Sequence, residues 1–246
     1  MDFYKKFKKK NLKNIQKQSN DINFSNLTTK WIKKATKFNY SYNFDWLGRP
    51  IIQYPQDIIV LQEIVFDRKP DLIIETGIAH GGSLIFFSSM LELLNLEKKK
   101  ERKIVGIDID IRKHNKRYIN NHFLKKNIIL MEGSSTDDKI IKKLNKIVRN
   151  KKVMVVLDSN HTHEHVLNEL KLYSKLVTKN QYLVVMDTIL EKICKSYPEN
   201  RPWHKGNNPE TALKEFLKEN KKFRLDNIPT KKSLITASPN GFLIKK

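Results

Sequence analysis

Acidic side chains stand at the ends of five short apolar runs that have the pattern of buried strands. These runs end at Glu75, Asp108, Glu132, Asp158 and Asp187. The carboxyl ends of parallel strands meet at one edge of an open α/β sheet, and ligands bind there. One or two such acids could be helix caps or loop residues. Five in succession predict a polar ligand site at that edge.

A glycine-rich turn, GIAHGGS at 77–83, follows the first of these runs. Gly77 and Gly81 permit a sharp turn and a close approach of the backbone to a ligand. Ser83 stands where the next helix should begin, a place that suits an anion. The spacing matches neither the phosphate loop of NTPases nor the dinucleotide fingerprint. The turn therefore lines a ligand site or, alternatively, only joins strand to helix.

Asp108 follows the first glycine by about 30 residues and ends the second run. An acid at that strand tip commonly accepts hydrogen bonds from ribose hydroxyls. The alternative is a capping aspartate.

Asp158 and Asp187 end the fourth and fifth runs, and His161 follows Asp158 closely. Two carboxylates at neighbouring strand tips suit a hard cation such as Mg²⁺. His161 could then act as a base, because the pKa of imidazole lies near physiological pH. A zinc site that also uses His163 and His165 is the alternative, but no strong zinc spacing is present. We expect His163 and His165 to lie on a helix surface or in helix packing.

Strand-like and helix-like segments alternate through most of the chain, which predicts a doubly wound, mostly parallel α/β sheet with helices on both faces. The predicted strands are 72–76, 103–108, 128–132, 153–157, 182–187, 223–226, 234–238 and 241–244, and the predicted helices are 56–67, 83–97, 112–123, 136–150, 163–178 and 209–220. The turn at 239–241 should close a C-terminal antiparallel hairpin. We expect one domain over residues 50–246.

Residues 1–49 form a different zone of helical and aromatic character. Residues 1–22 are rich in lysine and could form a basic amphipathic helix. That helix is either a solvated arm or a segment that contacts a membrane surface or a partner. The aromatic residues of 24–50 pack on the core or cover a pocket. The irregular segment 189–207 is a second candidate cover, in which Arg201, Trp203 and His204 could contact an acceptor.

Composition narrows the class of protein. The 246 residues carry 48 basic and 26 acidic side chains, a net charge of +22. Only eight of the basic residues are arginine, the residue that nucleic-acid binders favour, so dispersed lysine argues against a nucleic-acid partner. The single Cys194 excludes a disulfide framework, and neither a membrane-spanning run nor a secretory signal is visible. We therefore expect a cytoplasmic protein.

Several stretches together resemble the cephalosporin hydroxylase/rhamnosyl O-methyltransferase family. They are IIETGIAHGGSLIFFSSML at 73–91, LDSNHTHEHV at 157–166 and the closing ASPNGFLIKK at 237–246. The resemblance runs from about residue 40 to residue 246. It implies the Rossmann-like class I methyltransferase fold and the cofactor S-adenosylmethionine (SAM).

The resemblance also implies roles for individual residues, by analogy with metal-dependent O-methyltransferases such as catechol O-methyltransferase. The methionine part of SAM would lie against Glu75, Gly77, Gly81 and Ser83, the ribose against Asp108, and the adenine near Ser135. Asp158 would serve both cofactor and metal, Asp187 would be the second metal ligand, and His161 would occupy the place of a lysine base.

One departure concerns the metal. Relatives carry a further ligand directly beside the second aspartate, where this chain has Met186 and Thr188. The Thr188 hydroxyl could serve instead, so Mg²⁺ is an optional cofactor in this prediction.

The predicted reaction is methyl transfer from SAM to a hydroxyl of a small molecule, most simply a sugar or a polysaccharide or glycolipid precursor. The alternatives are an iron-dependent oxygenase, as the first family name suggests, and a non-catalytic partner protein on the same fold. The sequence leaves open whether the protein forms a homo-oligomer.

Overall fold

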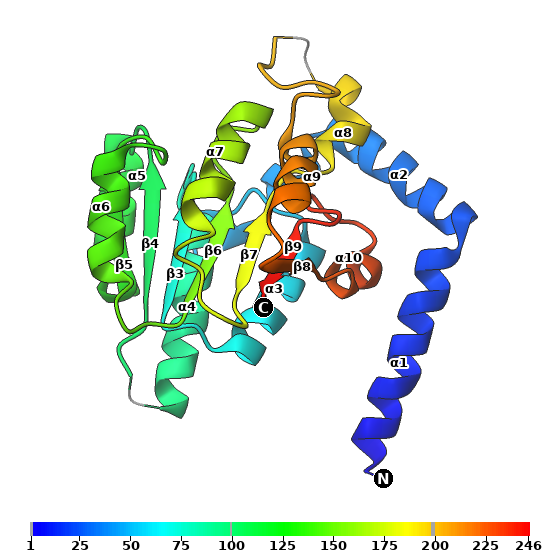
Figure 1. Ribbon diagram of the computed structural model, residues 1–246, viewed down its shortest axis with the longest axis horizontal. Helices are drawn as coiled ribbons and strands as arrows, with labels where there is room; N and C mark the ends of the chain where they lie inside the picture. Colours follow the sequence, from blue (N-terminus) through cyan, green and yellow to red (C-terminus); the bar gives the residue numbers. More distant parts are fainter. Residues whose placement is uncertain (1, 99, 198–199) are drawn as a thin grey trace.

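A seven-stranded sheet forms the centre of the molecule, in the order β5-β4-β3-β6-β7-β9-β8. The computed structural model describes residues 2–98, 100–197 and 200–246 (Figure 1). Five strands are parallel, namely β3 (Leu72–Thr76), β4 (Lys103–Asp108), β5 (Ile128–Glu132), β6 (Val153–Leu157) and β7 (Tyr182–Val185). The strands β9 (Phe242–Lys245) and β8 (Phe223–Leu225) are antiparallel additions at one edge. The predicted doubly wound α/β fold is confirmed.

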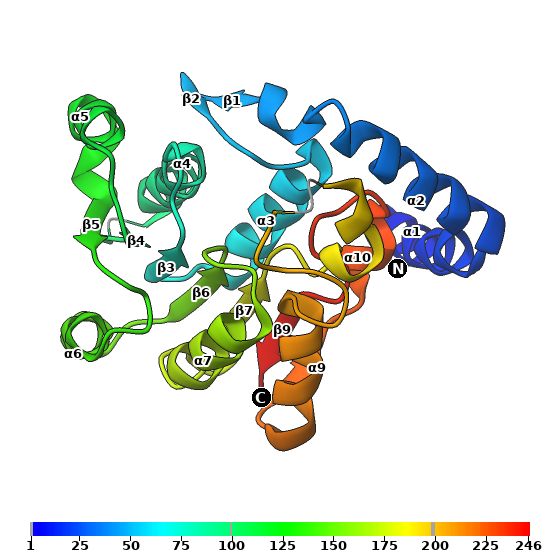
Figure 2. The same ribbon diagram turned by 90° about the horizontal axis from the view of Figure 1, so that it is seen from above.

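Helices cover both faces of the sheet (Figure 2). One face carries α3 (Pro55–Arg68), α4 (Gly82–Glu97) and α5 (Lys113–Asn121), and the other carries α6 (Asp138–Ile147), α7 (His163–Tyr173) and α9 (Pro209–Glu219). The central strands are continuous apolar runs because both of their faces are buried. Alternate residues of β3 therefore enter two separate cores: Ile73 packs with α3 and α4, whereas Leu72 and Ile74 pack with α7.

The C-terminal antiparallel pairing differs from the predicted hairpin. The segment 234–238 is not a strand, and β9 pairs instead with β7 and β8. A short helix, α10 (Ile228–Ser233), lies between β8 and that segment. The backbone of 234–238 is engaged elsewhere, because the Ala237 N–H donates to the Asp57 carboxylate and the Ala237 carbonyl accepts from Ile189.

The N-terminal zone consists of α1 (Phe3–Asn20), α2 (Ile22–Thr36), the 3-10 turn η1 (Tyr40–Asn43) and the two-stranded ribbon of β1 (Asp45–Trp46) and β2 (Arg49–Pro50). The ribbon is fixed to the sheet domain. The Trp46 indole donates to Ser89 Oγ at 3.1 Å, and the Arg49 guanidinium donates to the His80 carbonyl and to Asn115. The division at residue 49 stays a prediction.

The segment 189–207, predicted to be a loop, begins with the short helix α8 (Leu190–Ile193) and the 3-10 turn η3 (Cys194–Ser196). Residues 198 and 199 of this segment lie outside the described residues. Among the described helices, none combines the length and apolar character needed to cross a membrane.

The contact between the ribbon and α4 gives a test of the packing. A Cβ on Gly82 would lie 2.1 Å from the Pro50 carbonyl oxygen, so Gly82→Ala must push backbone away from backbone. We expect the free energy of unfolding in urea to fall by at least about 2 kcal/mol. Gly48→Ala is the control, since Gly48 has a positive φ of 82° but open space around it, and we expect it to lose only about 1 kcal/mol. Equal losses would contradict the packing described.

Candidate active site

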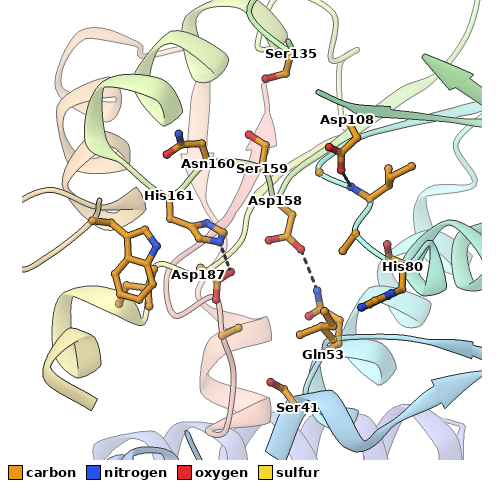
Figure 3. Close-up of a pocket in the computed structure, with 18 of the residues that line it drawn as sticks. Ser41, Gln53, His80, Asp108, Ser135, Asp158, Ser159, Asn160, His161 and Asp187 are labelled. Carbon is orange, nitrogen blue, oxygen red and sulfur yellow. Dashed lines mark hydrogen bonds and ion pairs between the residues drawn. The ribbon is translucent and has the colours of Figure 1, made fainter. Parts of the chain in front are cut away.

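The carboxyl ends of β3, β4, β6 and β7 open into a cavity of about 660 Å³, a size suited to a small-molecule ligand. Seven predicted site residues line it, namely Gly77, Ser83, Asp108, Ser135, Asp158, His161 and Asp187. Figure 3 labels the last five of them. Glu75 and Gly81 do not line the cavity. Glu75 is 1% exposed on β3, and Gly81 is the N-cap of α4 with φ +82°.

Gly77 forms the tightest contact in the site. Its φ is +79°, and a Cβ there would lie 2.0 Å from the carbonyl oxygen of Asp158. The Gly77 N–H also donates to the Ile107 carbonyl at 2.8 Å. Only glycine lets the turn after β3 fit between the ends of β4 and β6.

Asp108 holds the same glycine-rich turn through its carboxylate. Oδ2 accepts the Ile78 N–H at 2.9 Å, and Oδ1 accepts the Asp110 N–H at 3.2 Å. A carboxylate has about four lone-pair sites, so acceptor capacity remains for a ligand hydroxyl in the cavity.

Glu75 is a buried acid without a cationic partner in the described chain. Its Oε2 atom has no hydrogen-bond partner. Burial raises the pKa of Glu75 to about 8, the nearby Asp108 charge adds to this, and a hydrogen bond with Ser83 opposes it. At neutral pH Glu75 is therefore protonated until a cationic group approaches.

Asp158 and Asp187 face one another across the floor of the cavity. Burial raises the pKa of Asp158 well above its ordinary value, followed by repulsion from Asp187 and Glu75. Gln53 is a neutral side chain that donates a hydrogen bond to Asp158, from Nε2 to Oδ2 at 3.3 Å. Figure 3 shows Gln53 reaching Asp158 from the side opposite His161. Two facing carboxylates with one neutral donor form a site for a cation.

His161 completes a three-residue cluster with these acids. Its Nε2 lies 3.5 Å from Asp187 Oδ2. Ligand atoms of Asp158, His161 and Asp187 all lie within 4.8 Å of one another, a spacing that could hold a metal ion. Carboxylate oxygens suit Mg²⁺ or Mn²⁺, and imidazole suits transition metals better than Mg²⁺. His161 is thus placed to act either as base or as third ligand.

The residues beside Asp187 take no part in the cluster. Met186 is 2% exposed, and its sulfur accepts a hydrogen bond from Ser238. The Thr188 hydroxyl donates to the Pro239 carbonyl at 2.6 Å and is completely buried. The expectation that Thr188 could bind the metal is therefore wrong. Asp187 itself has a left-handed φ of 55°, which turns it away from the line of the strand.

His165 lies in the cavity, contrary to the expected surface or packing position. Its Nε2 is 3.1 Å from Ser135 Oγ and 3.0 Å from Ser159 Oγ. Ser159 also donates to the buried Glu169 at 2.8 Å. These polar groups surround Ser135, the residue near which the family resemblance would place the adenine of SAM. His163 has the expected packing role, since it contacts Thr211 and Glu215 of α9.

Aromatic side chains form the opposite wall. Trp203 packs edge-on against Tyr197 at 5.0 Å between ring centroids, and the Arg201 guanidinium lies 5.9 Å from the Trp203 ring. Arg201 and Trp203 line the cavity together with Tyr42 and Tyr54. His204 does not line it, and its ring hydrogen-bonds the Lys205 carbonyl instead. Segments 24–50 and 189–207 thus both contribute to this wall, as expected.

Comparison with known proteins decides the family. The family model described as "Rhamnosyl O-methyltransferase/CmcI" matches residues 38–246. The chain belongs to this family. Family membership places it among the O-methyltransferases and confirms the resemblance seen in its motifs.

Two curated relatives carry the name rhamnosyl O-methyltransferase. The protein of Mycobacterium leprae (strain TN) is 28% identical over 204 residues, which cover 82% of each chain. The protein of Mycobacterium tuberculosis (strain ATCC 25618 / H37Rv) is 28% identical over 187 residues, 75% of this chain and 71% of the relative.

Solved structures of CmcI share the fold. A CmcI structure described with Mg and SAM aligns with a TM-score of 0.58 and 18% identity, over 83% of this chain and 77% of that one. An apo structure of CmcI gives a TM-score of 0.57 and 17% identity, over 83% and 76%.

Several residues of the site were not predicted from the sequence. Gln53 precedes the first sheet helix and has no motif around it. His165 could have been found from its i, i+4 spacing with Glu169, which marks a polar helix face beside a strand tip. Asp57, in the first turn of α3, has the sequence pattern of an ordinary helix-dipole residue. It is instead 1% exposed and close enough to Asp187 for the two charges to interact.

Asp57 gives a prediction of pH dependence. Burial raises the pKa of Asp57 from 3.8 to about 7, with a further contribution from Asp187. Between these values the folded state retains a proton that the unfolded state has lost, so stability falls as pH rises and then levels off. The rise in pKa corresponds to about 4 kcal/mol. We expect Asp57→Asn to remove this part of the fall in unfolding free energy between pH 4 and pH 8.

Asp67→Asn is the matched control, because Asp67 lies on the same helix with a 70% exposed side chain. It should leave the pH dependence unchanged. An Asp57→Asn protein whose stability follows pH as steeply as the wild type would show that Asp57 does not carry the buried proton.

Proposed function

We propose that the protein transfers the methyl group of SAM to a hydroxyl of a sugar-like acceptor, with a divalent cation held by Asp158 and Asp187. The observation that carries the proposal is the concentration, at and beside the cavity, of carboxyl groups that have no lysine or arginine partner among the described residues. Glu75, Asp108, Asp158 and Asp187 stand at the ends of four adjacent strands. SAM is cationic at its sulfonium and its amine, and a metal ion adds further positive charge.

The cofactor half of the cavity fits a nucleoside attached to an amino acid. Asp108 retains acceptor capacity for ribose hydroxyls, and Ser135 with His165 offers polar groups for the adenine. The N–H groups at the start of α4, with Ser83, suit the methionine carboxylate. Glu75 does not line the cavity, but it hydrogen-bonds Ser83, which does, so its carboxyl group lies beside the place proposed for the positive amine.

The acceptor half fits a hydroxyl held between the acidic cluster and the aromatic wall. When bound, SAM supplies an electrophilic methyl group, and Mg²⁺ orients the acceptor hydroxyl and lowers its pKa. Asp158 and Asp187 hold this charge in place. His161 accepts the hydroxyl proton, while Trp203 and Tyr197 exclude water and offer apolar faces to a sugar ring. The rhamnosyl acceptor in the names of the mycobacterial relatives supports a sugar as the substrate class.

The alternatives fit the site less well. An iron-dependent oxygenase typically uses two histidines and one carboxylate. The described cluster has one histidine and two carboxylates. A non-catalytic partner protein would not need three carboxylates, Asp108, Asp158 and Asp187, gathered in one cavity. A cytoplasmic location stays a prediction, as does a homo-oligomer.

The cofactor proposal predicts the effect of Asp108→Asn. The amide keeps the shape of the side chain but loses the charge that strengthens hydrogen bonds from ribose. We expect calorimetric titration to show SAM binding at least tenfold weaker, about 1.4 kcal/mol. Asp110→Asn, two residues away and exposed, should bind SAM as the wild type does. Equal SAM affinity in all three proteins would remove Asp108 from the cofactor site.

The proton-transfer proposal predicts the effect of His161→Ala. Loss of a general base should lower kcat about 10²–10⁴-fold. The assay follows labelled methyl transfer from SAM to a rhamnosyl glycoside with Mg²⁺ present. SAM affinity should be unchanged, because His161 lies on the acceptor side. His163→Ala, which changes a packing histidine outside the cavity lining, should retain most of the activity.

Two results would revise this account. If His161→Ala also weakens Mn²⁺ binding more than tenfold, His161 is a metal ligand rather than the base. If the wild type methylates catechol but no glycoside, the acceptor is not a sugar.

A further inference from the structure

The first helix of the chain carries exposed aromatic side chains that pack against no core in the described structure. In α1 no residue is buried. Phe3 is 83% exposed, Tyr4 59% and Phe7 51%. Figure 1 shows the N-terminal half of α1 extending past the sheet domain. Soluble proteins seldom expose large aromatic side chains together without a partner.

The remaining surface of α1 is basic. Its 18 residues include seven lysines and no acid. Phe3 and Phe7 are four residues apart and share one face with Tyr4, whereas Lys6 and Lys13 lie on the adjoining polar face. Lysines in the first turns of a helix oppose the helix dipole, so this arrangement does not serve the stability of the helix itself.

The C-terminal half of α1 is attached to the body of the protein. The Gln18 side chain donates to the Lys231 carbonyl at 2.7 Å and to the Lys232 carbonyl at 3.2 Å. Lys231 Nζ donates to Gln16 Oε1 at 2.9 Å. These contacts hold the end of α1 against α10. The aromatic end is therefore carried at a fixed place relative to the enzyme.

We propose that α1 is an interfacial membrane helix that attaches the protein to an anionic lipid bilayer. Aromatic side chains on one face and lysines on the rest are the features of a helix that lies in the plane of a membrane surface. Phe3, Tyr4 and Phe7 enter the boundary between headgroups and acyl chains, and the lysines meet the acidic headgroups.

The charge and the aromatic residues of α1 favour an anionic bilayer over a second copy of the chain and over a nucleic acid. A second copy of the chain would bring seven more lysines to the same helix, within a protein of net charge +22. A nucleic acid would use the charge but would gain little from Phe3 and Phe7 placed together, and α1 contains no arginine. An anionic bilayer would contact both faces, the aromatic face with its acyl chains and the lysines with its acidic headgroups.

Co-sedimentation of the full chain with lipid vesicles tests the proposal. Vesicles of phosphatidylcholine with phosphatidylglycerol should bind the protein at low salt, whereas pure phosphatidylcholine should not. Phe3→Ser with Phe7→Ser should weaken vesicle binding at least about tenfold by removing the inserted side chains. The triple variant Lys6→Glu, Lys10→Glu and Lys13→Glu should weaken it at least as much.

The matched control makes the same change of net charge on α6, through Lys142→Glu, Lys143→Glu and Lys146→Glu. None of these lysines is buried. It should bind vesicles like the wild type. Equal loss in the control would mean diffuse attraction by net charge and would overturn the proposal. A wild type that binds no vesicles would also overturn it. So would a Phe3→Ser, Phe7→Ser variant that binds vesicles normally but has a smaller oligomeric state in solution, because the aromatic side chains would then contact a second copy of the chain.

Discussion

Burial of carboxyl groups, with repulsion between them as a second contribution, is the constraint on which this structure depends. Glu75, Asp158 and Asp187 converge at the ends of three adjacent strands, and Asp57 lies near Asp187. Among the described residues, no lysine or arginine lines this part of the cavity, and Arg201 lies on the aromatic wall. Burial raises the pKa of Glu75, Asp57 and Asp158, which favours their protonated forms, and a cationic ligand would favour the ionised forms instead. The site is therefore built to be completed by positive charge.

The backbone around the acids holds them in position. Gly77 lets the ends of β3 and β6 touch, and the segment 236–241 supports Asp187 from behind. That segment hydrogen-bonds Thr188, Ile189 and the buried Asp57 rather than forming a strand. The geometry of the acidic cluster thus depends on residues from both ends of the sheet domain.

The sequence predicted the sheet well because its strands are short apolar runs that end in acids, a pattern that few structures besides a buried parallel strand produce. The same pattern located Asp108, Asp158, His161 and Asp187 at one edge. It could not locate Gln53, whose contact with Asp158 joins segments far apart in the chain, or His165, which lies on a helix rather than at a strand end. It misassigned 234–238 because an apolar run followed by a Pro-Asn-Gly turn has the local pattern of a hairpin. The tertiary hydrogen bonds of Ala237, whose N–H donates to Asp57 and whose carbonyl accepts from Ile189, decide otherwise.

Proton release on cofactor binding tests the central claim most directly. Calorimetric titration of SAM at pH 7, repeated in two buffers of different ionisation enthalpy, counts the protons released per cofactor bound. The account predicts release of about one proton, because the positive amine and sulfonium force a protonated acid of the cluster to ionise. Binding of SAM without proton release would contradict it and would mean that the acids are already charged in the free protein.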